Sequence, residues 1–249
     1  MTAQASGNPE TPTTAAPAAV DKSGPRVQRM FGEIAPRYDR MNHLLSLNID
    51  RWWRRKTVRR IAPVAHSRIL DVCTGTGDLA IAFQRYLRGE ATIVGTDFCP
   101  EMLEIASSKA GDGEIRFSQA DAQALPFEDG SFDVVTVAFG LRNVEDTDQG
   151  LREMARVCQS GGTVGVLEFS HPRRWPIRPL YGLYFRHLLP RIGRWLSPSM
   201  DAYDYLPASV GEFPCYEKLT ARMEQCGLQE ARFYPLTFGI ATLYLASKP

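Results

Sequence analysis

The sequence predicts an α/β fold, with a Rossmann-like, mostly parallel sheet of seven strands that ends in an antiparallel C-terminal hairpin. Short apolar segments alternate with amphipathic ones from residue 26 onward, the pattern of strands and helices joined by right-handed βαβ crossovers. The last two strand-like segments have no helix between them, so we expect them to pair as the hairpin. A chain of 249 residues suits one domain with a single well-buried core.

The expected elements follow in a regular order. Residues 27–61 read as a helical stretch with polar and aromatic side chains. The strands expected next are 68–73, 92–97, 115–119, 132–139 and 163–169, and the helices between them are 78–88, 100–110 and 149–159. The segment Arg156–Gly162 reads RVCQSGG, and a glycine pair of this kind ends a helix. A helix at about 215–226 and strands near 229–236 and 240–247 complete the sheet.

Two segments depart from this alternation. Residues 1–25 are rich in Ala, Pro and Thr, so they cannot bury enough surface to offset the entropy of ordering, and we expect a disordered tail. Residues 171–214 are rich in proline and aromatic residues. Because the prolines prevent one continuous helix, we expect an apolar lid over a substrate here, within the single domain 26–249.

Composition and charge exclude several classes of protein. A formal net charge of +1 gives no global field that would recruit nucleic acid or an anionic membrane. The five cysteines form no C-x-x-C pair and no zinc-ligand spacing with the four histidines. This argues for a reducing compartment and against a disulfide framework or a structural metal. Neither a secretory signal nor a membrane-spanning apolar run is visible, so we expect a cytoplasmic protein.

A glycine-rich turn follows the first expected strand. The segment Arg68–Asp78 reads RILDVCTGTGD, and Gly75 and Gly77 let the backbone pass close to a ligand where a Cβ atom would clash. The next strand ends on Asp97, whose carboxylate can accept hydrogen bonds from both hydroxyls of a ribose. The third glycine of a dinucleotide fingerprint is replaced by Ala80. The pattern therefore favours an adenosyl sulfonium over a pyrophosphate cofactor.

A second carboxylate lies at the end of the third expected strand. Asp121 can accept a hydrogen bond from the exocyclic amine of adenine, while the backbone at Ala122 faces the ring. The segment SFDVVTV at Ser131–Val137 then forms a fourth strand that enters the same crevice, where ligands of open α/β sheets gather. These features together predict a pocket for S-adenosylmethionine (SAM). An NAD-dependent oxidoreductase is the alternative, but the sequence has no obvious acid at a hydride site.

Longer segments resemble the C-methyltransferases of menaquinone and ubiquinone biosynthesis. They are FGEIAPRYDRMN at Phe31–Asn42, LLSLNIDRWWRR at 44–55, FGLRNV at Phe139–Val144, LEFSHP at 167–172 and YLPASVGEFP at Tyr205–Pro214. The resemblance covers residues 27–249. It implies the class I SAM-dependent methyltransferase fold, SAM as methyl donor and a ring carbon of a prenylated quinol as acceptor. By position it also places SAM against Thr76, Asp97, Asp121 and Ala122.

The chemistry that this resemblance implies needs a charged group near the quinol. A ring carbon becomes nucleophilic when the neighbouring hydroxyl loses its proton, and a phenol-like pKa near about 10 makes this unfavourable at neutral pH. The site therefore needs a base or a stabilising cation. Arg142, in FGLRN, is our candidate cation, and its alternative role is a structural ion pair with Glu145 or Asp146. Tyr38, in YDRMN, either covers the cofactor or donates a hydrogen bond to the quinol, and its alternative role is a packed aromatic.

Two further residues near Tyr38 invite a catalytic interpretation. His43 titrates near neutrality and could act as a general base, but a lone histidine in an amphipathic helix is more often packed or exposed. For Asp39 we favour a surface charge of the helix over a base. Neither residue belongs to the predicted site, and we expect no metal in it.

Two basic, aromatic stretches bear on the partners of the protein. Arg51–Arg60 reads RWWRRKTVRR, and residues 172–195 mix six arginines with five aromatic residues. Such stretches suit a bilayer interface, where a prenyl tail resides. They equally suit nucleic acid, with bases stacked on the rings. For the first stretch a solvated helix face is the third alternative, and for the second we prefer the lid.

Taken together, the sequence predicts a SAM-dependent C-methyltransferase that converts demethylmenaquinol to menaquinol, the last step of menaquinone biosynthesis. The alternative within the same family is C-methylation of 2-methoxy-6-polyprenyl-benzoquinol in ubiquinone biosynthesis. An alternative from another class is an RNA-binding, methyltransferase-like protein, against which the balanced net charge argues. We expect an isoprenoid quinol as substrate, peripheral contact with the inner face of a membrane and no nucleic acid partner. The oligomeric state stays open.

Overall fold

The computed structural model describes residues 20–111, 115–184 and 201–249. Seven strands form one sheet in the order β3-β2-β1-β4-β5-β7-β6. The strands β1 to β5 are parallel, and β7 runs antiparallel to both of its neighbours, β5 and β6. Their bounds are β1 Arg68–Val72, β2 Thr92–Asp97, β3 Ile115–Gln119, β4 Phe132–Ala138, β5 Cys158–Phe169, β6 Gln229–Leu236 and β7 Ala241–Ser247. The predicted sheet with its C-terminal hairpin is confirmed.

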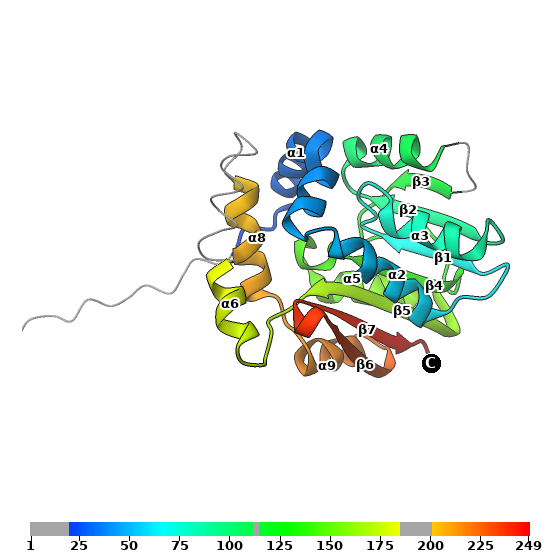
Figure 1. Ribbon diagram of the computed structural model, residues 1–249. Coiled ribbons are helices and arrows are strands. Elements are labelled where there is room, and N and C mark those ends of the chain that lie inside the picture. Colours follow the sequence, from blue (N-terminus) through cyan, green and yellow to red (C-terminus); the bar gives the residue numbers. More distant parts are fainter. Residues whose placement is uncertain (1–19, 112–114, 185–200) are drawn as a thin grey trace, which may run out of the picture.

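Helices cover both faces of the sheet (Figure 1). The helices are α1 Gly24–Leu45, α2 Ile49–Ile61, α3 Asp78–Leu87, α4 Pro100–Ala110, α5 Thr147–Val157, α6 Ile177–Leu183, α8 Asp201–Glu212 and α9 Glu217–Gln225, with short 3-10 turns η1 Leu141–Asn143 and η3 Thr237–Gly239. Val58 of α2 and Phe83 of α3 are buried with Ile69 and Ile93 of the sheet. Leu151 of α5 and Met223 of α9 belong to another buried cluster.

Three helices, α1, α6 and α8, lie beside one end of the sheet (Figure 1). α1 contacts α4, α2 and α8, and α6 lies below α8 in the same view. Residues of α1 and the turns after β1, β2 and β4 line a common crevice. These helices therefore cover the carboxyl ends of the strands, where a ligand of an open α/β sheet binds.

The observed element boundaries differ from the expected ones in three places. The helical stretch expected at 27–61 is two helices, because Leu47 and Asn48 adopt positive φ values of 52° and 61° and break the helix between them. The helix expected at 149–159 starts earlier, where the Asp146 side chain accepts hydrogen bonds from two backbone N–H groups, as an N-cap does. It ends at Val157, and the strand expected at 163–169 already begins at Cys158. The glycine pair thus lies inside the strand, beside a register shift against β4.

The two irregular segments are described only in part. α1 begins at Gly24, inside the tail expected over 1–25, and residues 1–19 of that tail lie outside the described residues. The lid expected over 171–214 contains α6 and α8, and its residues 185–200 lie outside the described part as well. In the part of the chain that the structure describes, no helix has the length and apolar character needed to cross a membrane.

Candidate functional site

A small crevice lies at the carboxyl ends of β1, β2 and β4. The turn after β1 opens it, because Gly75 and Gly77 have φ values of +56° and +80°, which side chains disfavour. A Cβ atom on Gly77 would also lie only 3.1 Å from side-chain atoms of Ala106 and Phe117. The turn therefore requires glycine, and its backbone borders a cavity of about 120 Å³.

Asp97 stands at the end of β2, next to this turn. Its Oδ2 accepts a hydrogen bond of 2.8 Å from the backbone N–H of Gly75, and its Oδ1 accepts one of 2.9 Å from Cys99. Burial raises the pKa of Asp97, and the backbone hydrogen bonds oppose that shift. Each oxygen retains a lone pair, so the carboxylate can accept further hydrogen bonds from a ligand in the crevice.

The crevice continues to the end of β3. Asp121 and Ala122 line it, and the Oδ1 atom of Asp121 accepts a hydrogen bond of 2.9 Å from the backbone N–H of Gln123. Asn143, from η1, lines the same crevice, and its buried Oδ1 has no hydrogen-bond partner among the residues that the structure describes. A buried acceptor of this kind is costly unless a ligand donates to it. The crevice thus fits a polar nucleoside ligand such as SAM.

Thr76 is placed differently from the other residues that the sequence predicted to hold SAM. It lines the crevice, but its hydroxyl donates a hydrogen bond of 2.5 Å to Oδ1 of Asp39 on α1. The Nζ atom of Lys109 on α4 lies 2.6 Å from Oδ2 of the same carboxylate. The side chain of Thr76 therefore fastens α1 over the glycine turn, and Asp39 serves as an anchor of the helix.

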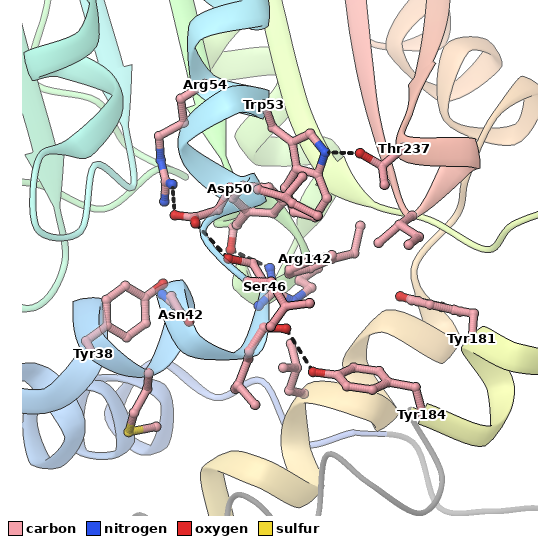
Figure 2. Close-up of a pocket in the computed structure, with 18 of the residues that line it drawn as sticks. Tyr38, Asn42, Ser46, Asp50, Trp53, Arg54, Arg142, Tyr181, Tyr184 and Thr237 are labelled. Carbon is pink, nitrogen blue, oxygen red and sulfur yellow. Dashed lines mark hydrogen bonds and ion pairs between the residues drawn. The ribbon is translucent and has the colours of Figure 1, made fainter. Parts of the chain in front are cut away.

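A second, larger cavity of about 450 Å³ adjoins the crevice. Figure 2 shows side chains from α1, α2, η1, α6 and η3 pointing into it. Most of its lining is aliphatic or aromatic, including Phe31, Trp53, Phe139, Phe169 and Tyr205. Tyr38, Arg54 and Phe139 line both cavities, so an apolar ligand in the larger cavity would meet the cofactor at these side chains.

Arg142 lies on the wall of this apolar cavity and is 5% exposed. Its Nη1 atom is 2.9 Å from Oε1 of Glu168, which is fully buried, and it also donates to the backbone carbonyl of Phe139. The partner is therefore Glu168 of β5, and not the Glu145 or Asp146 considered from the sequence. The Nε atom of Arg142 is buried, and none of the described residues accepts a hydrogen bond from it. A fixed cation with one unpaired N–H group thus lies at the cavity wall.

Tyr38 stands where the two cavities meet. It lines both of them, and its ring packs edge-on against Phe31 with centroids 6.0 Å apart. Burial raises the pKa of the Tyr38 hydroxyl, although the nearby Arg142 charge opposes this. The hydroxyl therefore remains protonated near neutrality and can donate a hydrogen bond. The structure brings Tyr38 and Arg142 to the same cavity.

His43 lines neither cavity. Its Nδ1 atom is 2.9 Å from Oδ2 of Asp50, which Arg54 also contacts at 2.5 Å and which accepts a hydrogen bond from Ser46. Burial alone would raise the pKa of Asp50, but the Ser46 hydroxyl and the Arg54 charge hold it below its ordinary value. His43, Asp50 and Asp78 bring ligand atoms within 4.8 Å of one another. The Arg54 guanidinium pairs with both carboxylates and offsets part of their negative charge.

Sequence reasoning missed the partner of Arg142. Glu168 stands in the segment VGVLEF, where every neighbour is apolar or glycine. A charge inside such a strand has to be paired when it is buried, so the strand pattern alone could have marked Glu168. Sequence reasoning also missed the position of Arg54, which it placed only in a basic stretch. The Arg54 side chain is 11% exposed and lines both cavities.

The sheet order, the glycine turn after β1 and the carboxylate at the end of β2 together define the fold of class I SAM-dependent methyltransferases. Solved structures agree with this fold. A SAM-dependent methyltransferase of Thermotoga maritima superposes with a TM-score of 0.61 at 18% identity, over 90% of this chain and all of the other.

Sequence comparison identifies the family within this class. The model of the ubiE/COQ5 methyltransferase family matches residues 19–248. The ubiquinone/menaquinone biosynthesis C-methyltransferase UbiE of a Geobacter species is 46% identical over 92% of this chain and 99% of its own length. The demethylmenaquinone methyltransferase of Deinococcus radiodurans is 47% identical over 90% of this chain and 93% of its own. The chain therefore belongs to the ubiE/COQ5 methyltransferase family.

Proposed function

We propose that this protein transfers the methyl group of SAM to a ring carbon of a demethylated isoprenoid quinol, converting demethylmenaquinol to menaquinol. Membership of the ubiE/COQ5 methyltransferase family supports the reaction class, and the name of the Deinococcus radiodurans relative supports the substrate. An apolar cavity of about 450 Å³ beside the nucleoside crevice suits a hydrophobic ring. Methylation of the ubiquinone precursor stays the second candidate, because the name of the Geobacter relative covers both routes.

The observation that carries the proposal is the buried Nε donor of Arg142. No residue in the described part of the chain accepts a hydrogen bond from it, and its side chain lies on the wall of a cavity whose lining is mostly apolar. A hydrogen bond between a quinol oxygen and this donor would satisfy it. Because a guanidinium stays protonated at all relevant pH values, it would favour the quinolate over the neutral quinol.

The chemistry follows from this placement. SAM, when bound, supplies an activated methyl group: its carbon–sulfur bond breaks as the bond to the ring carbon forms, S-adenosylhomocysteine keeps the electron pair, and the ring proton passes to water. Arg142 stabilises the negative charge on the quinol oxygen, and Glu168 holds the guanidinium in place through their ion pair of 2.9 Å. Tyr38, where the cavities meet, positions the ring against the cofactor.

For SAM itself we propose that Gly75, Gly77, Asp97, Asp121 and Ala122 form the binding surface. The glycines keep the turn open, and the carboxylate of Asp97 accepts from the ribose hydroxyls. Asp121 and the backbone at Ala122 face the adenine. Thr76 contributes indirectly, because its hydroxyl donates a hydrogen bond to Asp39 and so holds α1 over the crevice.

The first test is single-turnover transfer of labelled methyl from SAM to reduced demethylmenaquinone in detergent micelles. We expect the wild-type protein to form the methylated product. We expect the double variant Arg142→Gln/Glu168→Gln, which leaves no uncompensated buried charge, to lose about a hundredfold in rate. The exposed pair Arg85→Gln/Glu90→Gln is the matched control and should react as the wild type does.

A pH profile distinguishes electrostatic from structural loss. If Arg142 lowers the pKa of the quinol hydroxyl, raising the pH should recover part of the rate of the double variant and little of the wild-type rate. Equal rates in both proteins would return Arg142 to a structural role. A wild-type protein that binds SAM but yields no product from reduced demethylmenaquinone would refute the substrate.

A further inference from the structure

The mouth of the larger cavity is rimmed by apolar side chains that face solvent. Leu47, Leu180 and Phe238 line the cavity and are 78%, 65% and 69% exposed. They come from the turn between α1 and α2, from α6 and from η3. The Tyr184 hydroxyl donates a hydrogen bond of 2.9 Å to the carbonyl of Leu45, which holds α6 against the end of α1 (Figure 2). These segments therefore border one opening.

The apolar rim continues along the neighbouring helix surfaces. Leu44 and Leu183 are 52% and 58% exposed. Leu44 stands three residues after Met41 on α1, and Leu183 stands three residues after Leu180 on α6. Because Met41 and Leu180 line the cavity, each exposed leucine shares a helix face with a lining residue. Trp175, just before α6, is also exposed. We call these six residues the rim surface: Leu44, Leu47, Trp175, Leu180, Leu183 and Phe238. Large apolar side chains gathered on a surface in this way mark an interaction site.

Positive charges accompany the rim surface. Arg51 and Arg55 are exposed on the first turns of α2, directly after Leu47, and Arg174 and Arg178 are exposed beside Trp175. None of these four arginines forms an ion pair with a carboxylate among the residues that the structure describes. The chain as a whole carries a net charge of only +1, so the excess of positive charge is local. Apolar side chains beside free cations are complementary to an anionic lipid surface.

The volume of the cavity explains why an apolar surface is needed at its mouth. About 450 Å³ lies in the range of roughly 300–1,000 Å³ that holds one drug-sized molecule, which is enough for a quinol ring and the first part of its tail. The rest of a long prenyl tail has to leave through the mouth. Exposing its many CH₂ groups to water is unfavourable, so the tail needs an apolar phase directly outside.

We propose that the rim surface docks onto an anionic lipid bilayer, with its apolar side chains at the boundary of headgroups and acyl chains and the four arginines at the headgroups. The quinol ring then enters the cavity while its tail remains in the bilayer. This inference rests on the proposed function. The docking itself is a property of the surface and can be measured without substrate.

The test is flotation of the full chain with vesicles of phosphatidylcholine containing 30 mol% phosphatidylglycerol, against vesicles of phosphatidylcholine alone. We expect at least about tenfold stronger partitioning onto the anionic vesicles, falling as salt rises. The double variant Leu44→Glu/Leu183→Glu, which leaves the cavity lining intact, should lose about tenfold or more of this partitioning. The control is Val64→Glu/Tyr86→Glu, two exposed apolar residues at the opposite end of α2 and α3, which should partition like the wild type.

The outcomes separate the docking from the reaction. Methylation of a water-soluble, short-tailed demethylquinol in buffer should be equal in the wild type and in the Leu44→Glu/Leu183→Glu variant. Vesicle binding without any methylation would sink the proposed function and leave the docking in place. Methylation of the soluble quinol without vesicle binding, or equal binding by both double variants, would overturn the docking. Concentration-dependent self-association that only the rim variant abolishes, without vesicle binding, would assign the surface to a second copy of the chain.

Discussion

Asp71 is a buried carboxylate whose ionised form is disfavoured by its burial. It is the last residue but one of β1, is 1% exposed and accepts hydrogen bonds of 2.6 Å from Thr74 and 3.0 Å from Thr136. Burial raises its pKa to about 6, against the lowering effect of both hydroxyls. The ordinary value is 3.8, so the folded protein holds this proton more tightly than the unfolded chain does.

This shift predicts a pH dependence of stability. Because folding raises the pKa of Asp71, binding of its proton stabilises the folded protein most below the unfolded value of 3.8, and this contribution is lost as the pH rises through about 6. The variant Asp71→Asn has no titrating carboxyl group at this position, so its stability does not lose this contribution. Relative to the wild type, the free energy of unfolding of this variant should improve by about 2 kcal/mol between pH 4.5 and pH 8. Urea unfolding at both pH values measures the difference, and a difference that does not change with pH would contradict the pKa of Asp71.

At the residue scale, the sequence predicts those site features that a few consecutive residues encode. Gly75 and Asp97 adjoin the crevice as expected, because a strand end and a turn are written in a few consecutive positions. The pair of Arg142 and Glu168 escaped prediction, since its members are 26 positions apart and meet only when η1 packs against β5. Thr76 was predicted as a cofactor contact, and nothing in its neighbourhood along the chain indicated that Asp39 would take its hydroxyl.

At the element scale, α1 is the wall that both cavities share. Asp39 ties it to Thr76 and to Lys109, whose Nζ atom also lies 2.6 Å from Oδ1 of Asp78 on α3. Although burial raises it, the charges of Arg54 and Lys109 hold the pKa of Asp78 below its ordinary value. The helix is thus fastened by a polar cluster at the edge of the crevice that it covers.

Loosening this fastening should weaken cofactor binding more than it weakens the fold. The variant Asp39→Ala removes both contacts of the carboxylate, which are partly exposed and therefore contribute only about 1 kcal/mol or less each to stability. We expect a several-fold higher Kd for SAM by calorimetry and faster hydrogen exchange in residues 24–45. Arg40→Gln, an exposed change on the same helix, should alter neither. An unchanged Kd for SAM in Asp39→Ala would show that α1 does not close the crevice.

The elements themselves were predictable where the hydrophobic pattern is long and regular. All seven strands and the helices of the βαβ units appear close to their expected positions. The break between α1 and α2 was not foreseen, because Leu47 carries no sequence signal for the positive φ that it adopts. The early start of β5 escaped for another reason: pairing with β4 overrides the glycine pair as a boundary.

At the scale of the whole molecule, the arrangement of the two cavities predicts coupling between their ligands. Tyr38, Arg54 and Phe139 face both cavities, so a ligand in the crevice completes one wall of the larger cavity and holds α1 in place. The quinol then binds to a preformed site. A coupling of about 1 kcal/mol would change its affinity by about fivefold.

Linkage requires this coupling to be reciprocal, which makes it a demanding test. The Kd of a water-soluble quinol analogue should fall by about fivefold when the protein is saturated with S-adenosylhomocysteine, and the Kd of S-adenosylhomocysteine should fall by the same factor with the analogue bound. Calorimetric titrations in both orders measure the two factors. In Asp39→Ala both factors should approach one, because a loosened α1 transmits less. Independent binding in the wild type would mean that the shared wall is rigid before either ligand arrives.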